Sequence, residues 1–193
     1  AGQAAMAAAN ARLFTNAENN RFDFAPTGAA QAEVEALLSA GQPISDADQT
    51  ALPQFAGVVA KWALMTLRSL PIGMRVDQWL HGAYPALRDL QADGIATMQQ
   101  QNAAALSLRV EGRTVAAALL AMNSAYALFC DRLLNVTTYQ VAYQAAGAGD
   151  LGRDLLALWD RIPEAPAHDW ELVDAWANVL GMRAWYRWIP YRR

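Results

Sequence analysis

The stretch Pro53–Leu70, PQFAGVVAKWALMTLRSL, decides the fold class of this chain. Large apolar side chains recur in it three and four residues apart, the spacing that forms one face of an α-helix. They are Phe55, Val58, Val59, Trp62, Leu67 and Leu70. Proline fixes its φ angle and has no amide hydrogen, so Pro53 is expected to begin this helix and Pro71 to end it. The pattern predicts a helix that buries this face against other helices.

Comparable patterns lie on both sides of this stretch. They predict helices over residues 29–40, 74–93 with an interruption at 82–85, 95–108, 115–146, 150–162 and 170–188. The β-branched patch Val136-Thr137-Thr138 is the expected place for a break in the longest of them. Glu111-Gly112-Arg113 is read as a turn between helices; the alternative is a short hairpin between residues 106–110 and 114–115. Short loops rich in glycine and proline separate the helices, so the predicted fold is all-α, a single-domain bundle of about six to eight helices.

The two ends of the chain differ from the middle. Residues 1–25 are predicted to form an extended N-terminal arm, and residues 26–193 an α-helical domain with an aromatic and basic C-terminal helix. Phe14, Phe22 and Phe24 of the arm would be costly to leave in water. We therefore expect them to lie on the chain's own core or to make a subunit contact.

The chain has few charged residues, and its basic residues are almost all arginine. The chain has fourteen arginines and one lysine, Lys61, with a net charge of −3 and only 17% charged residues. Guanidinium suits bidentate contacts with phosphate or carboxylate, although a GC-rich genome would produce the same bias. The negative net charge argues against a protein that works through a bulk positive field. The low charged fraction indicates that another subunit covers part of the surface.

Arginine and aromatic residues alternate at the C-terminus. Such residues stack on bases, grip phosphates and anchor protein interfaces. The predicted contact residues for a nucleic acid or a protein partner are Arg183, Trp185, Tyr186, Arg187, Trp188, Tyr191, Arg192 and Arg193. The alternative is that this cluster folds back and closes the core.

The segment Gly147–Gly152 matches the dinucleotide fingerprint G-x-G-x-x-G. That fingerprint binds a pyrophosphate only between a buried strand and a helix. The residues before this segment favour a helix, and a proline-rich linker follows the next one. The segment is therefore interpreted as a turn between helices, and no cofactor is predicted.

Catalytic and metal-binding patterns are absent from the sequence. The histidines His81 and His168 lie far apart, and no H-x-x-x-H or C-x-x-C spacing exists, so no metal site is predicted. Asp89 and Asp93 share a helical face but need burial to act as an acid and base pair. Cys130 lies in an apolar run and is predicted to be a buried, inert thiol. No run of eighteen apolar residues occurs, so no transmembrane segment is expected.

These observations favour a non-enzymatic structural subunit that associates with copies of itself or with a related subunit. One form is a virion coat or filament protein that contacts nucleic-acid phosphates through arginines. The alternative is a bacterial helical module that binds a ligand or partner. An enzyme with an unidentified site comes third. The compartment stays open between a soluble protein and an assembled particle.

Overall fold

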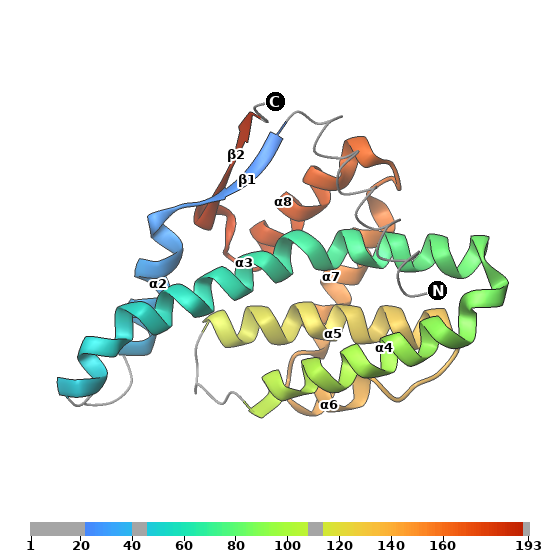
Figure 1. Ribbon diagram of the computed structural model, residues 1–193, viewed down its shortest axis with the longest axis horizontal. Coiled ribbons are helices and arrows are strands. Elements are labelled where there is room, and N and C mark those ends of the chain that lie inside the picture. Colours follow the sequence, from blue (N-terminus) through green and yellow to red (C-terminus); the bar gives the residue numbers. More distant parts are fainter. Residues whose placement is uncertain (1–21, 40–45, 108–113, 191–193) are drawn as a thin grey trace.

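A computed structural model describes residues 22–39, 46–107 and 114–190 of the chain. These residues form seven α-helices and a single pair of short strands, which confirms the all-α bundle (Figure 1). In chain order the elements are β1 (Phe22–Pro26), α2 (Gly28–Ser39), α3 (Asp46–Ala83), α4 (Arg88–Ala103), α5 (Thr114–Leu134), α6 (Gln140–Ala145), α7 (Gly149–Arg161), α8 (Asp169–Val179) and β2 (Tyr186–Pro190). The predicted turn at residues 111–113 lies outside the described residues.

Helix α3 is longer than predicted, because it continues through both prolines. It spans 38 residues and contains Pro53 and Pro71, which were expected to be its ends. An interior proline costs about 3 kcal/mol because it loses a hydrogen bond and crowds the preceding turn. Here Leu67 and Met74, both fully buried, continue the packing across Pro71. The carbonyl of Pro71 also accepts a hydrogen bond of 3.0 Å from the indole of Trp159. Tertiary packing outweighs the local preference.

The predicted interruption at residues 82–85 is confirmed, since α3 ends at Ala83 and a turn of 3-10 helix covers Pro85–Leu87. The predicted boundary at Gly94 is wrong: α4 runs through this glycine to Ala103. Packing fixes the helix here too, because Ile95 beside the glycine is buried.

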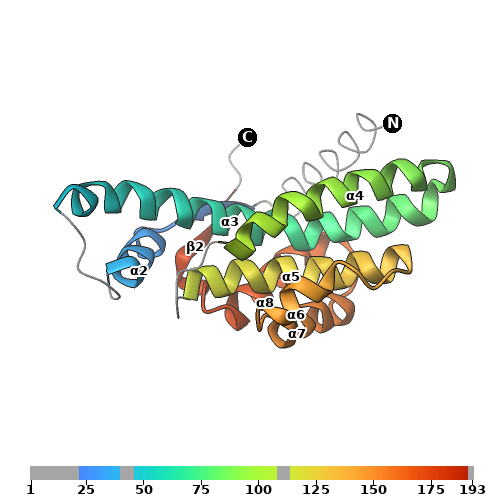
Figure 2. The same ribbon diagram turned by 90° about the horizontal axis from the view of Figure 1, so that it is seen from below.

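Helix α5 is the centre of the bundle and packs against α3 and α7 (Figure 2). Its approach to α7 is close at one glycine. A Cβ atom on Gly152 would lie 2.3 Å from the hydroxyl oxygen of Ser124, so only glycine fits between the two helices. The last glycine of the fingerprint therefore has a packing role in this fold.

The predicted break after α5 is confirmed at Asn135, which has a φ of 54°. A positive φ at this place ends a helix in the Schellman motif, and the amide of Val136 accordingly bonds back to the carbonyl of Asp131 at 2.9 Å. The buried carboxylate of Asp131 then accepts hydrogen bonds from the amides of Tyr139 and Gln140, at 3.0 and 3.1 Å. Asp131 thus binds the first free amides of α6.

The predicted C-terminal helix over residues 170–188 is wrong. Helix α8 ends at Val179, and Gly181 has a φ of 71°. The amide of Met182 bonds to the carbonyl of Ala177 at 2.8 Å, which is again the Schellman pattern. Past this end the chain makes a 3-10 turn over Arg183–Trp185 and then strand β2, so the described part of the aromatic and basic segment does not belong to an α-helix.

Strand β2 pairs antiparallel with β1, from Phe22 opposite Pro190 to Pro26 opposite Tyr186. The end of the predicted N-terminal arm is therefore a strand that lies beside the C-terminal strand (Figure 1). The amide of Thr27 continues the contact with a hydrogen bond of 2.8 Å to the carbonyl of Trp185. The remainder of the arm, residues 1–21, lies outside the described residues.

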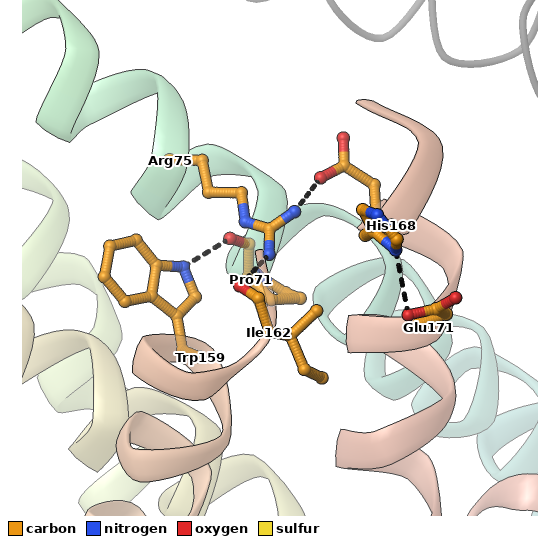
Figure 3. Close-up of polar contacts among 7 residues, drawn as sticks. Pro71, Arg75, Trp159, Ile162, His168 and Glu171 are labelled. Carbon is orange, nitrogen blue, oxygen red and sulfur yellow. Dashed lines mark hydrogen bonds and ion pairs between the residues drawn. The ribbon is translucent and has the colours of Figure 1, made fainter. Parts of the chain in front are cut away.

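A buried ion pair joins α3 to the start of α8. Arg75 and Asp169 expose about 1% and 2% of their side chains and are bonded directly. Arg75 also donates to the carbonyl of Ile162 at 3.0 Å, as Figure 3 shows. Asp169 is the first residue of α8, and its carboxylate is directed to Arg75. The pair fixes α3, the end of α7 and α8 relative to one another.

Candidate interaction surface on helix α3

The most apolar windows of α3 and α5 have the same mean hydropathy but are buried to different degrees. The segments Leu52–Ala83 of α3 and Ala117–Leu134 of α5 each contain an 18-residue window with a mean hydropathy of 1.2, and both are long enough to cross a membrane by length and composition alone. In α5, 67% of the apolar window is buried inside the bundle, whereas in α3 the share is 39%. Helix α5 is a core helix. Helix α3 has an apolar surface that the described part of the chain leaves uncovered, and the expected absence of a transmembrane segment stays a prediction.

The uncovered surface is a narrow row of large side chains on the first half of α3. Phe55, Val58, Trp62 and Met65 are 54%, 62%, 42% and 61% exposed. Their spacing of three, four and three residues places them at positions a, d, a and d of a heptad. We call these four residues the α3 seam. Its spacing is the one by which two helices interlock.

The opposite face of the same half is the one that the bundle buries. It consists mainly of alanine, with Ala56, Ala60 and Ala63 nearly inaccessible to solvent. Helix α2 lies against α3 there and is tied to it by a hydrogen bond of 3.1 Å from the Gln31 amide to the Pro53 carbonyl. In both views this part of α3, with α2 beside it, projects beyond the ends of α4 and α5 (Figures 1 and 2).

The sequence interpretation of this face is therefore wrong in part. Phe55, Val58 and Trp62 were expected to face the core, and they face solvent. Small residues allow helices to pack closely, so the alanine row became the inner face and the large residues the outer one. The signal was present in the sequence: alanines at 56, 60 and 63 also recur at helical spacing.

Charge is distributed unequally along the two flanks of the α3 seam. One flank, at heptad position g, carries Gln54, Lys61 and Arg68, all exposed. The other flank, at position e, carries Val59 and Thr66. The first flank is cationic and the second is uncharged.

The C-terminal aromatic residues predicted as contacts lie largely inside the chain. Trp185 and Tyr186 are buried, at 0% and 2% exposure. The Trp185 indole donates a hydrogen bond of 2.7 Å to Glu33 of α2, and the Tyr186 hydroxyl donates to Asp174 of α8. Burial raises the pKa of the Tyr186 hydroxyl well above its ordinary value. These two side chains close the core, which was the alternative interpretation.

The neighbouring residues are more accessible. Arg183 lies over the Tyr186 ring at 5.1 Å and forms an ion pair of 3.4 Å with Asp174. Arg187 is exposed, and the half-buried Trp188 donates a hydrogen bond of 2.9 Å to Asp174. For Arg183, Arg187 and Trp188, contact with a partner or a nucleic acid stays a prediction.

Six further predicted contact residues cannot be placed in the same way. Tyr191, Arg192, Arg193 and Phe14 lie outside the described residues. Phe22 and Phe24 belong to strand β1, where Phe24 is paired with Trp188 in the ladder.

The glycine-rich segment forms the turn between two helices, as predicted. Gly147, with a φ of 79°, follows α6, and Gly149 begins α7. The amide of Ala148 bonds to the carbonyl of Tyr143 at 3.0 Å, and these two residues pack together with Ala127. The structure gives the glycines local roles. The expected lack of nucleotide binding stays a prediction.

The remaining titratable candidates have ordinary structural environments. Cys130 is fully buried, and burial raises the pKa of its thiol to about 12, so the predicted inert thiol agrees with the structure. His81 is half-buried, with its Nδ1 atom 3.2 Å from the amide oxygen of Gln91. Asp89 and Asp93 are exposed, without the burial that an acid and base pair needs. Within the described ranges, no three His, Cys, Asp or Glu side chains are grouped as metal ligands would be.

A cleft of about 470 Å³ lies where α3, α5 and α7 meet the loop after α7. Arg75 and Arg132 line it together with Trp159 and Asp160. Arg132 lies 5.5 Å from the centre of the Trp159 ring and pairs with Asp160 at 2.9 Å, while Arg75 is bound to Asp169. Because both arginines already have carboxylate partners, the cleft is a weaker candidate site than the α3 seam.

Comparisons with known proteins add no further information on the site. The chain matches no protein-family model, no curated protein and no solved structure.

Proposed function

We propose that the protein is a non-enzymatic structural subunit that self-associates through the α3 seam. The observation that carries the proposal is the row of four large apolar side chains, each about half exposed, at heptad spacing. Single exposed apolar residues are common, but a contiguous row of this kind marks an interaction site. A heptad seam is complementary to a second heptad seam, because each side chain fits between four residues of the facing helix.

The size of the surface agrees with the centre of an interface. Aromatic side chains bury about 150–250 Å² each, so Phe55 and Trp62, about half exposed, leave about 200 Å² per copy, to which Val58 and Met65 add. A specific interface buries about 1,200–2,000 Å² in total, so residues beside the seam must contribute the remainder. The exposed flanks with Gln54 and Lys61 are positioned to do so. The low charged fraction of the chain, 17%, agrees with a covered surface.

The proposal is tested by sedimentation velocity at micromolar concentration. We expect the unmodified protein to sediment as a dimer or larger species, and Trp62→Glu/Met65→Glu to sediment as a monomer. The matched control is Trp170→Glu/Val179→Glu on α8, where both residues are about as exposed as Trp62. This control should associate as the unmodified protein does, and both variants should keep their helical circular dichroism.

An unmodified protein that sediments as a monomer contradicts the proposal, and so does a control that dissociates equally. Flotation with lipid vesicles distinguishes a second occupant of the seam. If a monomer binds vesicles through Trp62 and Met65, a membrane surface and not another copy covers α3.

A virion coat or filament protein is one form of such a subunit and adds contact between arginines and nucleic-acid phosphates. The ultraviolet absorbance spectrum of the purified assembly reports bound nucleic acid directly. Replacement of Arg183 and Arg187 by glutamine should then lower both the binding and its salt dependence, since each phosphate contact releases counterions.

A further inference from the structure

We infer that two copies pair their α3 helices parallel and in register, an inference that rests on the self-association proposed above. The inference rests on the different charges of the two flanks of the α3 seam. One flank holds Lys61 and Arg68, and the other holds the uncharged Val59 and Thr66. Residues at positions e and g lie next to the partner helix and set its orientation.

In a parallel pair, position g of one helix lies beside position e of the other. Lys61 then lies next to Thr66 of the partner subunit, and Gln54 lies next to Val59 of the partner subunit. No two charges of the same sign meet across the seam. The stem of Lys61 can extend along apolar surface while its charged end stays in water.

In an antiparallel pair, position g lies beside position g. When the four seam residues of both copies overlap fully, Lys61 lies next to Lys61 of the partner subunit. Like charges beside an apolar seam repel one another more strongly than in open water, because less water screens them. Among the described residues Lys61 has no carboxylate partner that would remove this repulsion. The charge pattern therefore selects the parallel arrangement.

The parallel arrangement also has a consequence for assembly size. A parallel pair in register is related by a two-fold axis, so the same surface is used on both copies and the contact closes at two. Further growth into a shell or filament then needs a second surface elsewhere on the molecule.

Cross-linking through introduced cysteines tests the orientation. Ser69 occupies the next position a after the α3 seam and is exposed, so Ser69→Cys places two thiols within disulfide distance only in a parallel pair. Val59→Cys does so only in an antiparallel pair, because only there do the e positions meet. The sole native cysteine, Cys130, is buried and gives little background, which the unmodified protein measures. We expect a disulfide-linked dimer from Ser69→Cys and none from Val59→Cys.

Both variants are first sedimented in reducing buffer, which separates the two proposals. A reduced monomer contradicts the self-association itself. A reduced dimer that cross-links through Val59→Cys, and not through Ser69→Cys, overturns only the parallel arrangement.

A charge variant provides an independent readout. Thr66→Glu places a carboxylate next to Lys61 of the partner subunit in the parallel pair, and symmetry forms this contact twice. We expect the dimer dissociation constant to fall about threefold at low salt and to return to its original value at high salt. The control Thr66→Gln should leave the constant unchanged. A Thr66→Glu dimer that is no tighter than Thr66→Gln contradicts the parallel arrangement.

Discussion

Most large apolar side chains in the first half of α3 are exposed, whereas most of those in the second half are buried. In the first half, Trp62 and Met65 are exposed, and α2 lies beside the alanine face. In the second half, Ile72, Met74 and Val76 are buried, and α5 and α8 pack on the helix. Apolar composition alone therefore does not fix burial. Neighbouring elements do, and the first half extends past them.

The largest expected effect comes from the second half of α3. Arg75→Met removes one partner of the buried pair with Asp169 and leaves a carboxylate without its charge partner, so we expect a loss of about 3–5 kcal/mol in the free energy of unfolding. Chemical denaturation at neutral pH measures it. The matched control is Arg132→Met, whose ion pair with Asp160 is half exposed and contributes about 0–1 kcal/mol.

Equal losses of stability for Arg75→Met and Arg132→Met would show that the Arg75–Asp169 pair is no more shielded from water than the Arg132–Asp160 pair. The double variant Arg75→Met/Asp169→Leu removes both charges, so it distinguishes the cost of an uncompensated buried charge from the loss of the ion pair itself. It should recover most of the lost stability.

The next effect contrasts two neighbouring residues of α3. Leu67 is fully buried and Met65 is 61% exposed. Leu67→Ala creates a cavity and should cost about 2–5 kcal/mol, whereas Met65→Ala should change the stability of the monomer by less than about 0.5 kcal/mol. Both variants are made in a Trp62→Glu background, in which we expect association through the α3 seam to be lost. Chemical denaturation then measures the stability of the monomer alone. Similar losses for the two would show that the α3 seam is covered within the monomer.

The smallest effect is a pH dependence at Asp77, in the second half of α3. Burial raises the pKa of this carboxyl, while hydrogen bonds from Gln91 and Tyr126 act in the opposite direction. A raised pKa means that the folded state holds the proton more tightly, so this contribution to stability is full below the unfolded pKa. It is lost as pH rises above about 4 and through the folded pKa.

Asp77→Asn stays neutral at every pH, so we expect its stability relative to the unmodified protein to increase as pH rises from 4 to 7. Thermal unfolding at several pH values measures the difference. The exposed Asp89→Asn on α4 is the control and should show no such trend. A stability of Asp77→Asn that falls relative to the unmodified protein as pH rises from 4 to 7 would contradict the raised pKa.

The helical class and most helix positions could be predicted from the sequence, because periodicity and the loop residues are local signals. The break after α5 followed from the β-branched patch, and the turn before α7 followed from its glycines. The course of α3 could not be predicted in this way. Pro71 is a local stop signal, and the packing of Leu67 and Met74 that overrides it comes from distant elements.

The candidate site was predicted less well than the fold. The α3 seam was mistaken for the inner face, since large apolar residues and alanines both recur at helical spacing and only the neighbouring elements decide between them. Conversely, Trp185 and Tyr186 were predicted as contacts, and their indole and hydroxyl groups bind Glu33 and Asp174 inside the chain. The local signal for their true setting was Gly181, whose positive φ ends α8 before them.

The pairing of β1 with β2 has a mechanical consequence. Phe22 and Pro190 lie opposite each other at one end of the ladder, where the chain continues in both directions. A pulling force applied across these two residues opens the ladder from that end, one hydrogen-bonded pair after another, as a zipper opens. The strands therefore yield at low force, before the load reaches α2 and α8. Under such a load we expect the two strands to separate while the helical bundle keeps its shape.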